Sequence, residues 1–108
     1  AGGGITSAIS KLREKVGHMT KIEAETRSLD ELREALAAGA DIIMLDNMTI
    51  EQMAEAVKIT GGKALLEASG NITADTIQAV AATGVDIISI GALTHSVKAF
   101  DISMKISL

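Results

Sequence analysis

The sequence predicts an α/β protein whose parallel βα units form about half of an incomplete TIM-like α/β barrel, with a C-terminal strand that pairs outside the barrel. Apolar, strand-like runs alternate with amphipathic segments, and one βα segment is repeated within the chain. Phe100 is the only aromatic residue and proline is absent, so the core must consist of aliphatic side chains. Strands that are apolar throughout are typical of parallel sheets covered by helices.

Four amphipathic segments predict helices. Their apolar residues recur three and four positions apart, which is the spacing of one helix face. Ser28 with Glu31, and Thr49 with Gln52, have the spacing of a capping box, and Thr73 is expected to cap the last helix. Glycines after the second and third segments predict where those helices end. The predicted helices cover residues 5–16, 28–38, 49–60 and 73–82, and the predicted strands cover 21–26, 41–45, 64–68 and 86–90.

An internal repeat with an offset of 45 positions aligns residues 28–45 with residues 73–90. Its shared core reads Gly-[Ala/Val]-Asp-Ile-Ile, which places a helix end just before a buried strand. At an offset of 44, Glu23-Ala24-Glu25 matches Glu67-Ala68-Ser69. The chain therefore reads as two βαβα units in tandem, and four such strands make half of an eight-stranded barrel. The other explanation is that βα loops recur by composition alone.

The composition excludes several classes of protein. The 108 residues carry 10 basic and 14 acidic side chains, a formal net charge of −4, without a Lys/Arg cluster, which argues against nucleic-acid and membrane-surface partners. The apolar runs are far shorter than the roughly 18 residues of a membrane-spanning helix. Cysteine is absent, so disulfide scaffolds and cysteine zinc sites are excluded, and the reducing cytoplasm is permitted but not proved. A cytoplasmic location is our expectation.

Half of a barrel has two sheet edges and a concave face that lack partners. We therefore expect residues 1–97 to be a partial barrel, the C-terminal half of one, that needs the missing upstream half of the same protein. Apolar and polar side chains alternate over residues 101–108, as in a strand with one buried face. We expect residues 98–108 to form a strand that pairs with polypeptide outside this sequence.

The reacting groups of a βα barrel lie at the C-terminal ends of its strands. Carboxylates at such ends suit Mg²⁺, ribose hydroxyls or a developing cation. Glycine-rich turns suit a phosphate, because their amides can approach its oxygens. The residues alone leave two other interpretations open. Asp46 is then a solvated loop residue or a helix cap, and Ser69-Gly70 is then a plain turn. The predicted strand ends are Glu25, Asp46-Asn47, Ser69-Gly70-Asn71 and Gly91-Ala92.

Five blocks of the sequence together resemble one family. In their order and separation they resemble the C-terminal half of quinolinate phosphoribosyltransferase, the carboxylating nicotinate-nucleotide pyrophosphorylase. The resemblance covers nearly the whole chain, which makes it more specific than any single short motif. The blocks are Lys21–Glu25, Glu31–Asp41, Met44–Met48, Leu66–Gly70 and Gly91–Ser103.

The resemblance implies a glycosyltransferase of NAD biosynthesis that converts quinolinate and phosphoribosyl pyrophosphate to nicotinate mononucleotide, pyrophosphate and CO₂ with Mg²⁺. It implies an N-terminal sandwich domain to which the C-terminal strand returns, and a homodimer or larger homo-oligomer. By the same resemblance, Glu25 and Asp46 are the catalytic acids beside the ribose and the metal, which they hold directly or through water. The residues implied to hold the 5′-phosphate are Ser69, Gly70, Asn71, Gly91 and Ala92.

The chain departs from the family pattern at one turn residue. The family often has Ser-Gly-Gly where this chain has Ser69-Gly70-Asn71. Asparagine tolerates left-handed backbone geometry and keeps its amide, so we expect phosphate binding to survive. The family's quinolinate-binding cations lie mostly upstream of Ala1. These 108 residues alone are therefore not expected to bind quinolinate, and the whole enzyme is expected to be active only with its upstream half.

The basic residues of this chain offer few acceptor ligands. Arg13 and Arg33 are expected on solvated helix faces, and Lys21 is expected as a surface cation at the structural end of the barrel. His18 and His95 have no role that the sequence assigns. Two alternatives to the enzyme remain: a non-catalytic half-barrel that self-associates through its concave face, and a molybdenum-transport-associated relative with the same phosphate site but another acceptor.

Overall fold

A computed structural model describes residues 4–17, 19–90, 93–96 and 104–106, the last two segments by their backbone alone. Its centre is a sheet of four parallel strands, each of which begins one residue later than the sequence predicts. The strands are β1 (Ile22–Thr26), β2 (Ile42–Asp46), β3 (Leu65–Ser69) and β4 (Ile87–Ile90). The prediction of an α/β fold built from parallel βα units is confirmed.

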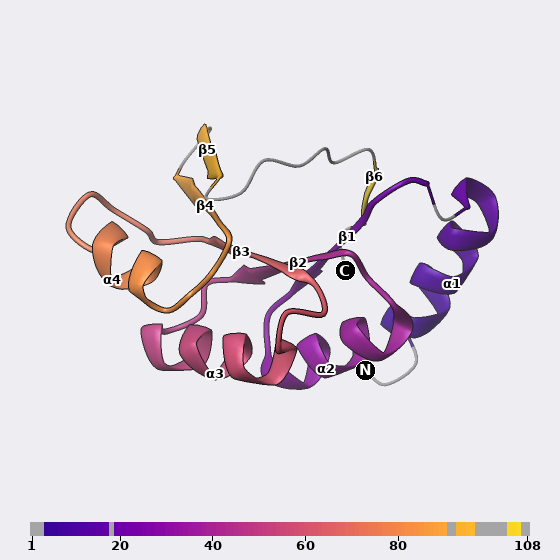
Figure 1. Cartoon of the computed structure of the whole chain (residues 1–108), viewed down its shortest axis with the longest axis horizontal. Coiled ribbons are helices and arrows are strands. Elements are labelled where there is room, and N and C mark those ends of the chain that lie inside the picture. The colour runs from indigo at the N-terminus through magenta and orange to yellow at the C-terminus, as the bar shows by residue number, and fades with distance from the viewer. Residues whose placement is uncertain (1–3, 18, 91–92, 97–103, 107–108) are drawn as a thin grey trace.

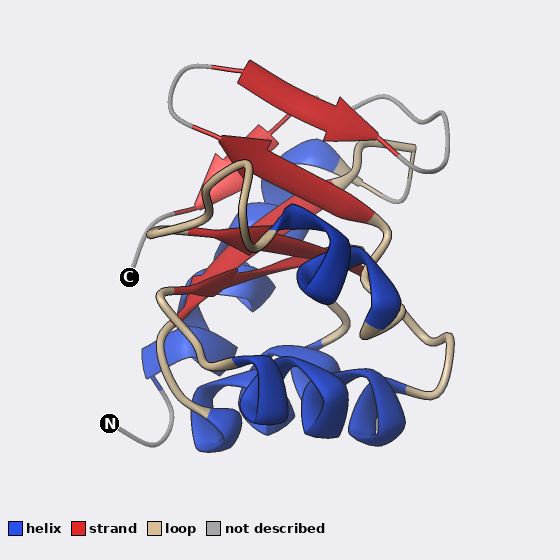
Figure 2. Cartoon of the chain, turned by 90° about the vertical axis from the view of Figure 1, so that its left-hand side faces the viewer, coloured by secondary structure: helices blue, strands red, loops and turns tan. Residues whose placement is uncertain are grey.

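Four helices accompany these strands. Figures 1 and 2 show α2 and α3 side by side over one face of the sheet, and α1 packs against α2 and β1. Their alternation with the strands gives a βαβα order, as in one half of an α/β barrel. The helices are α1 (Gly4–Val16), α2 (Leu29–Ala38), α3 (Ile50–Thr60) and α4 (Ile77–Ala82).

The predicted caps of α2 and α3 are confirmed. Ser28 Oγ accepts a hydrogen bond from the Glu31 amide at 3.2 Å, and Thr49 with Gln52 forms a complete capping box. In α2 the Glu31 carboxylate accepts from the Arg27 amide at 2.7 Å, one residue before the cap. These bonds satisfy amide groups that have no partner inside a helix, so each helix starts at a fixed position just after a strand end.

The prediction for the fourth helix is wrong at its start. Thr73 does not cap it, because α4 begins at Ile77 and its N-cap position is Thr76, which makes no side-chain capping bond. Instead, the Thr76 amide donates to the Thr73 carbonyl at 3.1 Å, and Thr76 Oγ1 accepts from the Thr73 amide at 3.0 Å. Threonine bonds readily to nearby backbone in this way, and here those bonds close a separate turn ahead of the helix.

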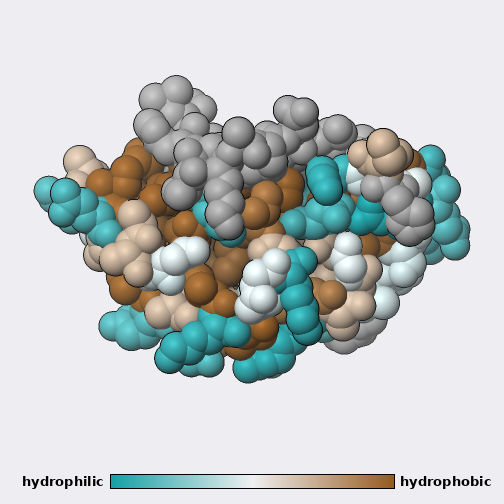
Figure 3. All heavy atoms as spheres, viewed as in Figure 1, coloured by the Kyte–Doolittle hydropathy of each residue, from teal (hydrophilic) through white to brown (hydrophobic). Residues whose placement is uncertain are grey.

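The two faces of the sheet carry different side chains because successive residues of a strand point to opposite sides. The helix-side face is apolar and joins a core with buried residues of α2 and α3 such as Leu32 and Met53. In Figure 3 apolar surface gathers over the middle of the molecule, above the hydrophilic outer surface of the helices. The helix-side residues of the strands are Ile22, Ala24, Ile43, Leu45, Leu66, Ala68 and Ile88.

The opposite face, which corresponds to a barrel interior, mixes apolar and acidic side chains. Ile42, Met44 and Ile87 are buried here, so the expectation that the side chains of the concave face lack partners is wrong for these three. The polar residues of this face are Glu23, Glu25, Asp46, Glu67, Ser69 and Ser89.

The sequence repeat has a structural cause. The Asp41 carboxylate accepts from the Ile22 amide at 2.9 Å, and the Asp86 carboxylate accepts from the Leu66 amide at the same distance. Each repeated aspartate therefore uses its side chain to join the start of its own strand to the start of the preceding one.

The expectation that Arg13 is solvated is wrong, because it donates to Asp41 at 2.7 Å and to the Thr20 carbonyl at 2.8 Å.

Two further strands border the parallel sheet and give the order β5-β4-β3-β2-β1-β6. β5 (Leu93–Ser96) is antiparallel to β4, and the sequence did not predict it. β6 (Met104–Ile106) is parallel to β1, whereas we predict pairing outside this chain; the structure differs because the free edge of β1 offers unpaired backbone groups. The domain division after residue 97 stays a prediction, and residues 97–103 and 107–108 lie outside the described residues. In the described part of the chain, no helix is both long and apolar enough to cross a membrane.

Candidate active site

The carboxyl ends of β2 and β3 lie beside each other and share backbone bonds. Asp46 pairs with Ser69 in the register of the two strands. Just beyond this pair, the Asn47 amide donates to the Ser69 carbonyl at 2.8 Å, and the Asn71 side-chain amide donates to Asn47 Oδ1. Asn47 and Asn71 both have φ of +57°, which asparagine tolerates better than most residues. The predicted acid and the predicted phosphate turn are therefore neighbours.

Gly70 lies where the two turns approach each other closely. Its φ is +84°, and a Cβ built on it would lie 3.0 Å from Asp46 Oδ1 and 3.1 Å from the Asn47 amide nitrogen. Glycine is therefore required here for two reasons, its backbone conformation and the absence of a side chain. Without a Cβ, the turn after β3 can rest directly against the acid at the end of β2.

Glu25 belongs to the same rim, one strand away. It pairs with Met44 in the register of β1 and β2, two residues before Asp46, and both carboxylates lie on the face opposite the helices. A strand separation of about 4.8 Å and a rise of about 3.3 Å per residue place their Cα atoms about 8 Å apart. Both residues are half-buried, so neither side chain is sealed inside the core.

Arg27 is a rim residue that sequence reasoning missed. It follows β1, and its Nε lies 3.6 Å from Asp46 Oδ2, with 61% of the Arg27 side chain and 36% of the Asp46 side chain exposed. A pair this exposed contributes little to stability. The only signal in the sequence was its position. Arg27 is the first residue after β1, as Asn47 is after β2 and Gly70 is after β3.

Two buried glutamates were also missed as members of this face. Glu67 is 4% exposed and accepts a hydrogen bond from Ser89 Oγ of the neighbouring strand, and Glu23 is 1% exposed. Strand alternation was the available signal, since Glu67 stands two residues before Ser69 and Glu23 two before Glu25. The interior face below the rim is therefore acidic as well.

The remaining predicted residues divide into two groups. Gly91, Ala92 and His18 lie outside the described residues, as does the side chain of His95. Lys21 is exposed at the amino end of β1, as predicted. Arg33 is 55% exposed and pairs with Asp30 within α2 at 3.3 Å, which confirms its place on a solvated face.

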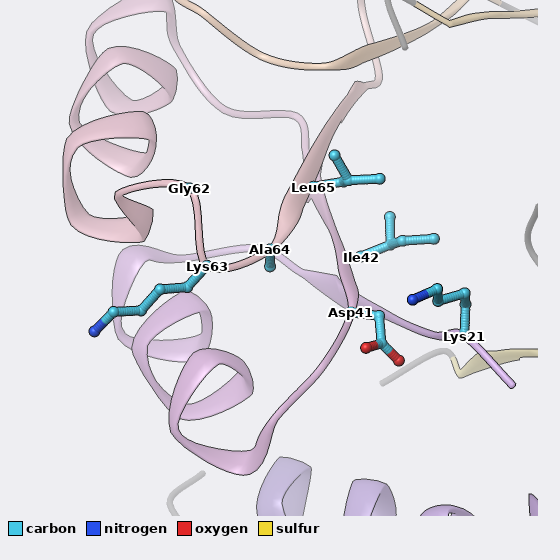
Figure 4. A pocket seen from close by; sticks show the side chains of 7 residues that line it. All are labelled: Lys21, Asp41, Ile42, Gly62, Lys63, Ala64 and Leu65. Carbon is cyan, nitrogen blue, oxygen red and sulfur yellow. The ribbon is translucent and has the colours of Figure 1, made fainter. Parts of the chain in front are cut away.

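A hollow of about 220 Å³ lies at the opposite edge of the sheet. Figure 4 shows it at the amino ends of β2 and β3, with the Lys63 side chain pointing away from it and the Asp41 carboxylate beside it. Since Asp41 is held there by Arg13, its charge is already compensated. The hollow is therefore separate from the rim, where the acids and the glycine turn gather.

The fold and rim together define the class of protein: a segment of an α/β fold of the barrel type, with acidic residues and a glycine turn gathered at the carboxyl ends of its strands. The chain belongs to the quinolinate phosphoribosyl transferase family, because the model of that family's C-terminal domain matches residues 1–105. The prediction from the sequence blocks is thereby confirmed.

Individual relatives agree with this assignment. The chain is 47% identical over 106 residues to a probable carboxylating nicotinate-nucleotide pyrophosphorylase of Bacillus subtilis, covering 98% of this chain and 37% of the relative. It is 48% identical over 110 residues to a probable carboxylating nicotinate-nucleotide pyrophosphorylase of Methanocaldococcus jannaschii, covering 95% of this chain and 39% of the relative. The chain thus spans less than half the length of the relatives it matches.

A solved structure shows the same fold. The nicotinate-nucleotide pyrophosphorylase of Francisella tularensis superposes with a TM-score of 0.78 at 48% identity, over 85% of this chain and 32% of that one. Because the identity is high, the likeness extends beyond the general barrel architecture to this family.

Proposed function

We propose that the protein containing this chain is a carboxylating nicotinate-nucleotide pyrophosphorylase, which joins quinolinate to the phosphoribosyl group of phosphoribosyl pyrophosphate. The products are nicotinate mononucleotide, pyrophosphate and CO₂. The observation that carries the proposal is the rim itself: Asp46 and the 69–71 turn contact each other at neighbouring strand ends, in a chain that matches the family along 1–105.

The two rim acids, Glu25 and Asp46, would interact with the ribose. Loss of pyrophosphate from C1 leaves an oxocarbenium-like cation on the ribose, and Glu25 with Asp46 would stabilise that charge or hold the ribose hydroxyls. Such preorganised electrostatic groups usually supply a large share of a rate enhancement, because they need no rearrangement when the charge develops. The close approach of Gly70 to Asp46 supports this role, since it places the carboxylate directly beside the turn.

The 69–71 turn would hold the 5′-phosphate. At Gly70 no side chain would keep a phosphate away from the backbone of the turn, and Ser69 is half-buried beside Asp46. Turns of this kind present amides to anions. Gly91 and Ala92 are proposed to complete the phosphate site. Anchoring the phosphate would fix the position of C1 relative to the attacking pyridine nitrogen, which is an orientation effect.

Mg²⁺ is the proposed cofactor. Mg²⁺ is commonly bound through one or two carboxylates together with substrate phosphates, and the rim offers two carboxylates. Glu25 and Asp46 would hold it, directly or through water. Bound there, the ion would supply charge neutralisation for the diphosphate.

The remaining parts of the proposal concern the whole protein. Quinolinate would be bound mostly by cations outside this chain, and we propose a cytoplasmic homodimer or larger homo-oligomer. In the whole protein the 98–108 segment would exchange the edge of β1, to which β6 pairs in this chain, for an N-terminal sandwich domain. Sedimentation of the full-length protein measures the oligomeric state.

The test is turnover by the full-length protein. With quinolinate, phosphoribosyl pyrophosphate and Mg²⁺ we expect release of CO₂ and formation of nicotinate mononucleotide, and chelation of the metal should abolish both. Asp46→Asn and Glu25→Gln should each lower turnover about a hundredfold or more while leaving thermal unfolding nearly unchanged. Normal turnover in either variant would remove that residue from the mechanism, and an inactive parent enzyme would refute the function.

A further inference from the structure

The rim is acidic, yet the proposed donor substrate is an anion with charge at both of its ends. Glu25 and Asp46 stand at the rim, with Glu67 and Glu23 below them on the same face. A diphosphate placed beside these carboxylates needs a compensating positive charge from the protein, in addition to any metal ion. A basic residue of this chain that stands at the rim would supply part of that charge, beside the cations outside this chain.

Only Arg27, among the Lys and Arg side chains that the structure describes, pairs with a carboxylate at the carboxyl edge of the sheet. Arg13 is held by Asp41 at the amino edge. The remaining basic side chains line the hollow at that same edge or lie on helix surfaces: Lys21, Lys63, Lys11, Lys15, Arg33 and Lys58.

The backbone of Arg27 is fixed while its side chain reaches into solvent. Its amide donates to Glu31 Oε1 at 2.7 Å, and the next residue, Ser28, caps α2. The side chain is 61% exposed and lies at 3.6 Å from Asp46, a separation longer than that of a strong charge-assisted hydrogen bond. The guanidinium is therefore placed at the rim, beside the Asp46 carboxylate.

The order of groups along the rim matches the order of groups in the donor. The phosphate turn follows β3, Asp46 ends β2, and Arg27 follows β1, and these three strands are consecutive neighbours. From β3 to β1 the rim extends about 10 Å, at about 4.8 Å per strand. A phosphoribosyl diphosphate carries its two anionic groups on C5 and C1, at opposite ends of the ribose. With the 5′-phosphate at β3 and the ribose at Asp46, the diphosphate lies toward β1.

We propose that Arg27 binds the diphosphate of the phosphoribosyl donor and retains it as the leaving group. The inference rests on the proposed function. An arginine suits this task because its planar guanidinium forms paired hydrogen bonds with phosphate oxygens. Substrate binding turns Asp46 toward the ribose and Arg27 toward the diphosphate, so that a weak surface pair is exchanged for two stronger contacts with the ligand.

The experiment compares Arg27→Gln with Arg33→Gln in the full-length protein. Both substitutions remove one positive charge from an exposed side chain that is paired with an aspartate, and only the first lies at the rim. We measure the KM for the donor and for quinolinate, and competition by two probes, pyrophosphate and ribose 5-phosphate. The second probe keeps the 5′-phosphate and ribose but lacks the diphosphate.

Arg27→Gln should raise the donor KM and weaken inhibition by pyrophosphate at least about tenfold, the effect of losing one strong charged hydrogen bond. Inhibition by ribose 5-phosphate and the quinolinate KM should stay unchanged, and Arg33→Gln should change nothing. The donor KM and the pyrophosphate inhibition of Arg27→Lys should lie between those of the parent and those of Arg27→Gln, because lysine keeps the charge but loses the paired geometry.

Three results would overturn the inference. Equal weakening of both probes would mean that Arg27 acts through Asp46 on the ribose, and a rise confined to the quinolinate KM would assign it to an acceptor carboxylate. Values equal to those of Arg33→Gln would remove it from the site. If the parent enzyme shows no turnover, the proposed function fails, but calorimetric binding of pyrophosphate to parent and Arg27→Gln still decides the role of Arg27.

Discussion

Replacing Gly70 by alanine should test the contact on which the candidate site depends. The new Cβ would lie 3.0 Å from Asp46 Oδ1, 3.1 Å from the Asn47 amide nitrogen and 3.3 Å from the Asn47 Cα. The Asp46 carboxylate can rotate away, whereas the Asn47 backbone is held by its bond to the Ser69 carbonyl at 2.8 Å. The substitution should therefore displace the acid and push the two turns apart.

Gly62→Ala supplies the matched control for this change. Gly62 has a φ of +80°, close to the +84° of Gly70, but a Cβ there would meet no atom within 4 Å. Left-handed backbone costs a residue with a side chain roughly 1–2 kcal/mol, and this cost is common to both variants. Overpacking adds about 1–3 kcal/mol, and only Gly70→Ala incurs it.

We expect Gly70→Ala to lower the free energy of unfolding of the full-length protein by about 1–3 kcal/mol more than Gly62→Ala does. Turnover should fall strongly in Gly70→Ala alone, because Asp46 and the phosphate turn both move. Denaturant titration and steady-state kinetics measure these two effects. Equal stability and equal turnover in the two variants would refute the argument that Gly70 packs against the acid.

Other predictions concern stability in the full-length protein. Thr49→Ala removes the capping box of α3 and should cost about 1 kcal/mol in denaturant titration, whereas Thr73→Ala, at a position that caps no helix, should cost clearly less. Asp41→Asn weakens the bond from Arg13, whose side chain is 21% exposed, and should cost about 2 kcal/mol. Asp30→Asn, in a pair whose aspartate is 92% exposed, should cost at most about 0.5 kcal/mol. Equal losses within either pair of variants would contradict the roles assigned here.

Much of the fold could be predicted because its signals are local. The bonds of Ser28 and Thr49 to residues three positions later join neighbours in the sequence, so their spacing alone identified both helix starts. Thr73 failed as a cap for the same kind of reason, because a competing local bond with Thr76 was equally available. Spacing identifies the possible bond but does not decide between two partners.

The candidate site could be predicted in part. Asp46 and the 69–71 turn were found because parallel strands place their carboxyl ends at one edge. Arg27 and the bond between Ser89 and Glu67 were not found, since each joins residues about 20 positions apart. Such contacts depend on strand register, and a shift of one residue would turn these side chains to the other face.

The sequence by itself determined the order of helices and strands, the aliphatic core and the residue types at the strand ends. The tertiary structure decided which strand ends touch, that Gly70 rests on Asp46, and that Arg27 reaches the same carboxylate. It also decided that Asp41 and Asp86 join successive strand starts, which explains the repeated motif. The physical reason is that caps and apolar spacing act within a few residues, whereas a binding site is made by groups that only the packing of strands brings together.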